Sequence, residues 1–224
     1  MNVVYAMTRN VYEWAAPSIR SLAHYNPKAR VFILCEDDEF PVDLPIPVET
    51  INVKGQKWFP EDGPNYSNPF SYINLLKVVY PSLLPVQKVI HLDIDTIVCD
   101  SLEPLWKTDV SGKWFAAVPQ FRGQFIQFGD KYYNMGVALL NLSQMRKDKA
   151  EQPLAEYLNT VAGPYADQDA WNNHTDKAVP IEVRWNENWA TGETDNPAIV
   201  HYCGISDWYG NQFLHRGEYL WRWK

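Results

Sequence analysis

Two short apolar runs near the N-terminus, separated by a segment with helical spacing, constrain the fold more than any other feature of the chain. Residues 2–7 (NVVYAM) and 29–36 (ARVFILCE) are rich in apolar, β-branched and aromatic side chains, which favours buried strands. Residues 11–25 place apolar side chains at helical spacing. A strand, a helix and a second strand in this order predict a parallel β-α-β unit, the building block of α/β folds.

The same alternation continues along the chain. We expect further strands at residues 48–53, 87–95, 114–120, 135–142 and 198–203. We expect helices at residues 70–84, ending near Pro81, and at residues 143–161 and 167–174. Residues 54–69 are rich in Gly, Pro and Asn, which predicts a loop. No repeat or change of composition marks a domain boundary, and 224 residues suit one domain. The sequence therefore predicts a single α/β domain, residues 1–224, with a mixed, mainly parallel central sheet.

Charge and composition exclude several classes of function. The net charge of −7 offers no basic face for nucleic acid. No apolar segment is long enough to span a membrane, and the N-terminus lacks the basic start and apolar stretch of a signal peptide. Cys35, Cys99 and Cys203 are too few and too widely spaced for a disulfide framework or a Cys-rich zinc site. We expect a reduced, cytoplasmic protein.

Two carboxylates, Asp93 and Asp95, stand one residue apart at the end of the predicted strand 87–95. Ligands of open α/β sheets bind at the carboxyl ends of the strands, and residues i and i+2 of a strand share a face. The two acids can therefore converge on one divalent cation. Carboxylates suit Mg²⁺ or Mn²⁺, and an imidazole from His201, in the last predicted strand, favours Mn²⁺. Such an ion would neutralise charge on a departing nucleotide diphosphate.

Four segments in order carry a family resemblance. They are VIHLDIDTIVCDSLEPLW (89–106), YYNMGVALLNLSQMR (132–146), ADQDAWN (166–172) and IVHYCG (199–204). Together they resemble the successive motifs of the retaining nucleotide-sugar glycosyltransferases of family 8. The segment YAMTRNVYEWAAPSIRSL (5–22) is similar to the family's first β-α unit, so the resemblance covers nearly the whole chain.

This resemblance implies a GT-A fold, with residues 1–100 as the nucleotide-binding half. Residues 101–224 would form the sugar and acceptor half and a short C-terminal tail. The donor would be a UDP-sugar carrying a hexose, glucose or galactose. The acceptor would be a saccharide or glycan precursor. The cofactor would be Mn²⁺, with Mg²⁺ as the alternative ion.

The resemblance also implies roles for individual residues. The metal ligands would be Asp93, Asp95 and His201, and Asp93 would also touch the ribose. The uridine would be bordered by Ala6, Thr8 and Tyr12, and the rest of the donor by Lys77, Asn134, Gly136 and Gly204. Gln168, with Asp167 beside it, would lie under the sugar and stabilise an oxocarbenium-like transition state. A diphosphate oxygen would then deprotonate the acceptor on the same face, whereas a double displacement through Asp167 or Asp169 is the alternative.

Two positions depart from the family pattern. Thr8 and Arg9 stand where the family usually has an acidic pair, which weakens the hydrogen bond expected to the uracil edge. Asp207 stands where a phosphate-binding Lys is usual, so another cation should assist the diphosphate. The candidates are Arg9, Lys77, Arg122, His215 and Arg216.

Other interpretations of these segments remain open. VIHLDIDTIV also fits the motif of haloacid dehalogenase-type phosphatases, in which Asp93 would attack phosphate and Asp95 would be the general acid. A catalytically silent sugar-nucleotide-binding relative is a third possibility. Asn134 to Gly136 could be a turn, and Trp185 and Trp189 could be either an acceptor platform or core. The basic and aromatic C-terminal tail permits at most weak membrane contact.

Overall fold

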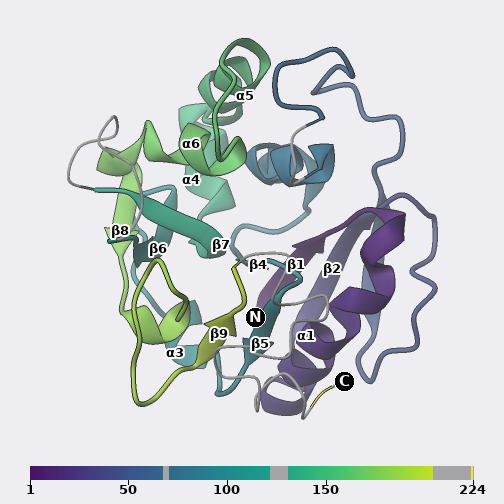
Figure 1. The fold of residues 1–224 in the computed structure, drawn as a ribbon, viewed down its shortest axis with the longest axis vertical. Coiled ribbons are helices and arrows are strands. Elements are labelled where there is room, and N and C mark those ends of the chain that lie inside the picture. The colour runs from purple at the N-terminus through teal and green to yellow at the C-terminus, as the bar shows by residue number, and fades with distance from the viewer. Residues whose placement is uncertain (68–70, 122–130, 204–222, 224) are drawn as a thin grey trace.

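The computed structural model describes residues 1–67, 71–121, 131–203 and 223 (Figure 1). Its central sheet has seven strands in the order β3-β2-β1-β4-β7-β6-β8. The strands are β1 (Asn2–Ala6), β2 (Arg30–Cys35), β3 (Val48–Asn52), β4 (Val89–Leu92), β6 (Phe115–Pro119), β7 (Tyr133–Leu140) and β8 (Ala178–Pro180). The pairs within β3-β2-β1-β4 and the pair β6-β8 are parallel, while β7 runs antiparallel to β4 and β6. The predicted mixed, mainly parallel sheet is confirmed.

Alternate residues of the strands enter two separate cores. In β1, Val4 and Ala6 face one core, and Val3 and Tyr5 face the other, as the two-residue period of a strand requires. The first core is covered by η2 (Tyr72–Val79), α2 (Tyr80–Leu83), α4 (Leu142–Asp148), α5 (Glu151–Thr160) and α6 (Asp167–Asn172). The second is covered by α1 (Tyr12–Tyr25), α3 (Glu103–Trp106) and η5 (Val183–Trp185). In Figure 1, α4 to α6 lie above the sheet and α1 and α3 below it. Short 3-10 turns, η1 (Arg9–Val11) and η4 (Thr175–Lys177), complete the elements used below.

A second, two-stranded sheet pairs β5 (Thr96–Val98) with β9 (Ile199–His201) in antiparallel register. Thr96 lies opposite His201. β5 was not predicted in the sequence analysis, which ended the preceding strand at residue 95. Its pairing with β9 brings the end of the chain's last described strand next to Asp93 and Asp95.

The segment predicted as one helix at residues 70–84 is different in the structure. It forms the 3-10 helix η2 followed by the single turn α2. Pro81 explains the change, because it has no N–H for a bond to the carbonyl of Lys77 and its ring would clash with that carbonyl in a continuous α-helix. Since side chains at i and i+3 eclipse in a 3-10 helix, Asn74 and Lys77 share one face of η2.

Three further boundaries differ from the prediction. Strand β4 ends at Leu92, so Asp93 and Asp95 lie in the turn before β5 and converge through that turn rather than along a strand face. The predicted helix 143–161 divides into α4 and α5 at Lys149, whose φ of 56° is left-handed. Asn134 and Gly136 lie inside β7, which excludes the turn interpretation of this segment.

Features relevant to cellular context are few. Within the part of the chain that the structure describes, none of the helices combines the length and hydropathy needed to cross a bilayer. The three cysteines are free thiols. Near the C-terminus, the Trp223 ring packs against His24 and Tyr25 of α1, with centroid distances of 5.1 and 6.4 Å. The rest of the tail lies outside the described residues, so its membrane contact stays a prediction.

Candidate active site

A cleft of about 220 Å³ opens where η2, the turn between β4 and β5, β7, α6 and β9 meet. Eight of the residues that the sequence analysis singled out line it: Lys77, Asp93, Asp95, Asn134, Gly136, Asp167, Gln168 and His201. The cleft lies at the carboxyl end of β4, where ligands of α/β sheets bind. Side chains that are far apart in the sequence therefore share one site.

Asp93, Asp95 and His201 form a cluster suited to a metal ion. One ligand atom from each can be chosen so that all three lie within 4.8 Å of one another. His201 Nε2 is 3.2 Å from Asp95 Oδ1 and 3.8 Å from Asp93 Oδ2. Burial opposes a charge on His201, but Asp95 and Asp93 outweigh it and raise the pKa of the ring. Two carboxylates and an imidazole are a donor set that suits Mn²⁺.

Gly136 of β7 has no side chain, which leaves room for the cluster of Asp93, Asp95 and His201. A Cβ atom there would lie 2.1 Å from His201 Cε1 and 2.9 Å from Asp93 Oδ2. The backbone of this residue also binds the cluster, because Asp93 N donates to Gly136 O at 2.7 Å. Glycine is thus required here by close approach of side chains, and the cradle it creates fits a metal held by these ligands.

Lys77 connects the cluster of Asp93, Asp95 and His201 to α6. Its Nζ is 2.9 Å from Asp93 Oδ1 and 3.2 Å from Asp167 Oδ2, and the side chain is buried. Burial opposes the ammonium charge, but the two carboxylates outweigh burial and raise the pKa of Lys77. Burial likewise opposes the charge of Asp93, yet Lys77 and then His91 hold the pKa of this carboxyl far below its usual range.

His91 and Tyr80 support Asp93 and were missed in the sequence analysis. His91 Nε2 is 2.9 Å from Asp93 Oδ1, and His91 Nδ1 is 3.1 Å from the Tyr80 hydroxyl. Burial, followed by the charge of Lys77, lowers the pKa of His91 to about 4, so the ring is neutral at neutral pH. It therefore donates from Nε2 to Asp93 and accepts from Tyr80. Asp93 Oδ1 is engaged by Lys77 and His91, which leaves Oδ2 to face His201.

Helix α6 brings Asp167 and Gln168 into the cleft. Burial raises the pKa of Asp167 to about 6, against the opposing effect of Lys77. Its Oδ2 has the Lys77 ammonium nearby but no hydrogen-bond partner among the described residues. Gln168 Oε1 accepts from Met135 N at 3.1 Å, which orients the amide. Gln120, not predicted, accepts from Gln168 Nε2 at 3.5 Å.

Asp169 has a different environment from its two neighbours. It is fully buried, and its oxygens accept from the Tyr132 hydroxyl at 2.5 Å and from Tyr165 N at 3.0 Å. It is not among the residues that line the cleft. Asp169 thus ties α6 to the start of β7, and the geometry gives no support to a double displacement through it.

Replacing Tyr132 with phenylalanine should loosen this attachment. The loss of one hydrogen bond to a buried carboxylate is expected to cost about 1.5–3 kcal/mol of unfolding free energy. Activity should fall as well, because α6 carries Asp167 and Gln168. Urea unfolding and steady-state kinetics would measure the two effects. Tyr133→Phe is the matched control, since the Tyr133 hydroxyl makes no hydrogen bond to Asp169 among the described residues; equal losses in both variants would contradict the prediction.

Several predicted residues do not line this cleft. Ala6, Thr8 and Tyr12 lie together between the end of β1 and the start of α1. Thr8 Oγ1 donates to Asn10 Oδ1 at 2.6 Å, so Thr8 already has a local partner. Arg9 forms a two-point ion pair with Asp37 instead of facing the cleft. Other predicted positions lie outside the described residues: Arg122, Gly204, Asp207, His215 and Arg216.

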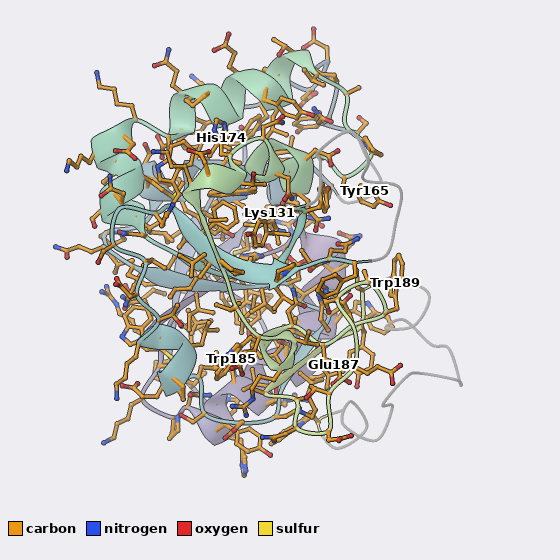
Figure 2. All side chains as sticks on the ribbon, turned by 90° about the vertical axis from the view of Figure 1, so that its left-hand side faces the viewer. Lys131, Tyr165, His174, Trp185, Glu187 and Trp189 are labelled. Atoms are coloured by element: carbon orange, nitrogen blue, oxygen red, sulfur yellow. The ribbon has the colours of Figure 1, made fainter. Side chains whose placement is uncertain are left out.

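The two tryptophans that the sequence left undecided have separate roles. Trp185 is buried in the second core. Trp189 lines the cleft, is 53% exposed, and donates from Nε1 to Cys203 O at 2.8 Å. Figure 2 shows Trp189 near the right-hand edge of the view and Trp185 further inside. Five cleft residues were not predicted as site residues: Asn74, Gln120, Met135, Tyr165 and Cys203.

Comparisons with known proteins point to one protein family. The family model described as "Glycosyl transferase family 8" matches residues 2–207. The glycosyltransferase GlyA of Streptococcus pneumoniae is 23% identical over 217 residues, which cover 92% of this chain but only 29% of GlyA. General stress protein A of Bacillus subtilis is 24% identical, with 82% of this chain and 74% of that protein covered.

Solved structures show the same fold. A crystal structure of the galactosyltransferase LgtC in complex with donor and acceptor sugar analogs matches with a TM-score of 0.80 and 21% identity. The match covers 99% of this chain and 94% of LgtC. Mouse xyloside xylosyltransferase 1 matches with a TM-score of 0.67 and 17% identity, over 90% of this chain and 97% of that one. The predicted GT-A fold is confirmed.

Proposed function

This chain belongs to glycosyltransferase family 8, and from that membership we propose that it transfers a hexose, glucose or galactose, from a UDP-sugar to a saccharide or glycan-precursor hydroxyl, with retention of configuration. The observation that carries the proposal is the convergence of Asp93, Asp95 and His201 beside Asp167 and Gln168 in one cleft. A cation held by these three side chains would offset the charge on a leaving diphosphate, and Asp167 and Gln168 offer polar groups to a sugar beside it.

The proposed cofactor is Mn²⁺, with Mg²⁺ as the alternative. Asp93 Oδ2, an Asp95 oxygen and His201 Nε2 would hold it. When bound, the ion would neutralise negative charge on the departing diphosphate. Lys77 would keep Asp93 ionised, because its ammonium sits on the other carboxylate oxygen. We therefore expect Lys77 to contribute to donor binding partly through its ion pairs with Asp93 and Asp167.

For the sugar, we propose contacts from α6 and β7. The Asp167 Oδ2 atom has the Lys77 ammonium beside it but no hydrogen-bond partner in the described part of the chain, so it is suited to accept from a donor hydroxyl. Gln168, held by Met135 N, would place its amide oxygen near the anomeric carbon and stabilise positive charge there. A diphosphate oxygen would take the acceptor proton on the same face. Asn134 and Gly136 would form the wall opposite α6.

The proposed nucleotide and acceptor sites rest on the position of residues in the sheet and on the exposure of Trp189. Ala6, Thr8 and Tyr12 lie at the carboxyl end of β1, next in the sheet to β4, which is where a base bound beside Asp93 would be expected. Trp189 offers an exposed ring in the cleft on which an acceptor sugar can stack. Gly204 stays proposed at the diphosphate. A cytoplasmic location stays a prediction.

Removing the metal should abolish donor turnover. We expect UDP release from one UDP-sugar with Mn²⁺, less with Mg²⁺, and none above background with EDTA. The test incubates the protein with UDP-, GDP- and dTDP-linked sugars and measures released nucleotide without acceptor. Release that EDTA does not affect would contradict the metal proposal, and silence across the panel would favour the catalytically silent alternative. The phosphatase alternative is not favoured, since the family match covers residues 2–207 rather than the Asp93 segment alone.

A further inference from the structure

Asn186 links the proposed metal ligand His201 to the backbone of β7. It is fully buried, in the segment between η5 and β9. Its Oδ1 is 2.9 Å from His201 Nδ1, and its Nδ2 is 2.9 Å from Asn134 Oδ1. Figure 2 shows the course of this segment through Trp185, Glu187 and Trp189. The sequence analysis did not single out Asn186.

A backbone amide determines which way Asn134 and Asn186 point. Gly136 N can only donate, and it lies 3.1 Å from Asn134 Oδ1, so Asn134 must place its oxygen there. Asn186 must therefore direct its NH₂ group toward that oxygen. Its own oxygen then faces His201. The usual ambiguity of an amide side chain is removed by geometry.

A second backbone anchor leads independently to the same orientation. Asn188 Oδ1 accepts from Ala190 N at 2.8 Å and from Thr191 N at 3.1 Å. Asn188 must then donate from Nδ2, and it does so to Asn186 Oδ1 at 3.1 Å. The anchor at Gly136 N and the anchor at Ala190 N and Thr191 N therefore both require Asn186 Oδ1 to face His201.

We infer that Asn186 is a positioning residue that sets the tautomer of His201 and so presents the Nε2 lone pair to the space between Asp93 and Asp95. Because Asn186 Oδ1 can only accept, the hydrogen must sit on His201 Nδ1. Without Asn186, an Nε2–H bond to Asp95 Oδ1, 3.2 Å away, would be favoured and would compete with a cation. Hydrogen bonds to the remote nitrogen of a metal-binding histidine serve this purpose. The role in metal binding rests on the proposed function, whereas the tautomer itself does not.

The tautomer can be measured directly in metal-free protein. Long-range ¹H–¹⁵N NMR of ¹⁵N-histidine-labelled protein at about pH 9, where histidine rings are neutral, distinguishes Nδ1–H from Nε2–H. We expect Nδ1–H for His201 in the unsubstituted protein and a shift to Nε2–H in Asn186→Leu. An Nε2–H ring in the unsubstituted protein would overturn the inference, without depending on the folding of any variant.

Affinity for Mn²⁺ alone, measured from the free-ion EPR signal, tests the consequence. We expect Asn186→Leu to bind Mn²⁺ about 10–100-fold more weakly. Asn186→Asp should recover only part of the affinity, because its carboxylate still accepts from Nδ1–H but places a second acceptor oxygen against Asn134 Oδ1. Thr191→Val is the matched control: it removes a hydroxyl that donates to Asn186 O in the same buried segment but leaves the amide in place. Its Mn²⁺ affinity should be unchanged.

The two proposals fail in different ways. If Thr191→Val weakens Mn²⁺ binding as much as Asn186→Leu does, the segment acts only as structural support and the inference is wrong. If the NMR result is as expected but the unsubstituted protein binds neither Mn²⁺ nor Mg²⁺, the tautomer assignment is supported and the metal-dependent function is overturned.

Discussion

Asp95→Ala is expected to lower metal-dependent donor turnover by about 10³-fold. The ion would supply several kcal/mol of charge stabilisation at the transition state, and each 1.4 kcal/mol corresponds to a tenfold change in rate. Asp95 is one of only two carboxylates in the described His, Cys, Asp and Glu cluster, and its partner Asp93 shares one oxygen with Lys77 and His91. Loss of Asp95 should therefore be harder to compensate than loss of an ordinary surface acid. Nucleotide release at saturating donor, over a range of Mn²⁺ concentrations, measures the effect.

The control for Asp95 is a carboxylate outside the cleft. Asp109, in the turn after α3, is exposed and binds the backbone of Ser111. Asp109→Ala removes the same charge and should leave turnover within twofold, a change below about 0.5 kcal/mol. Unfolding curves of both variants should be similar, since neither substitution empties a core position. The assignment of Asp95 as a metal ligand would be wrong if Asp95→Ala kept full activity or if its requirement for metal were unchanged.

Lys77→Met is expected to destabilise the protein by about 3–5 kcal/mol, because it leaves two carboxylates in the site without their shared counter-ion. Lys77 and Asp167 are buried and Asp93 is half-buried. For a chain of this size, such a loss lowers the Tm by roughly 10 °C. Added Mn²⁺ should raise the Tm of Lys77→Met by more than it raises that of the unsubstituted protein, since the cation would replace part of the missing positive charge. Thermal unfolding with and without Mn²⁺ is the measurement.

Two further variants separate charge from packing at this position. Lys77→Arg keeps the positive charge at this position. It should lose less stability than Lys77→Met. Asp167→Asn combined with Lys77→Met removes one of the two stranded carboxylates, so the double variant should recover part of the loss. A Lys77→Met protein that unfolds within about 1 kcal/mol of the unsubstituted one would show that the ammonium is not the counter-ion of the site.

Much of the fold was predictable from local patterns. The runs at 2–7 and 29–36 became β1 and β2 because their alternate side chains fill two cores, a property written into the composition of each run. Boundaries were less predictable. Pro81 is visible in the sequence, and the sequence analysis ended the helix near it, but no local pattern showed that Tyr72–Val79 forms a 3-10 helix instead of an α-helix.

Some residues of the candidate site could be predicted from the chemistry of their side chains. Others are recognised only through their contacts in the folded protein. Asp93, Asp95 and His201 were chosen by residue type and position, Asp167 and Gln168 by the family resemblance, and all five line the cleft. Asn186 and Gln120 are polar residues without a distinctive local pattern. His91 has a weak signal, since it lies two residues before Asp93 in the predicted strand 87–95, and its ring contacts Asp93 in the structure.

Local patterns along the chain were enough to predict the α/β class, most of the strands and helices, and the acidic and imidazole groups available for a metal. How those groups are held depends on contacts between distant segments. The register that puts Thr96 opposite His201, the space above Gly136, and the direction of the Asn186 amide all depend on which distant segments the sheets bring together. A side chain's type states what it can donate or accept, whereas its partner is set by long-range pairing that no local pattern contains.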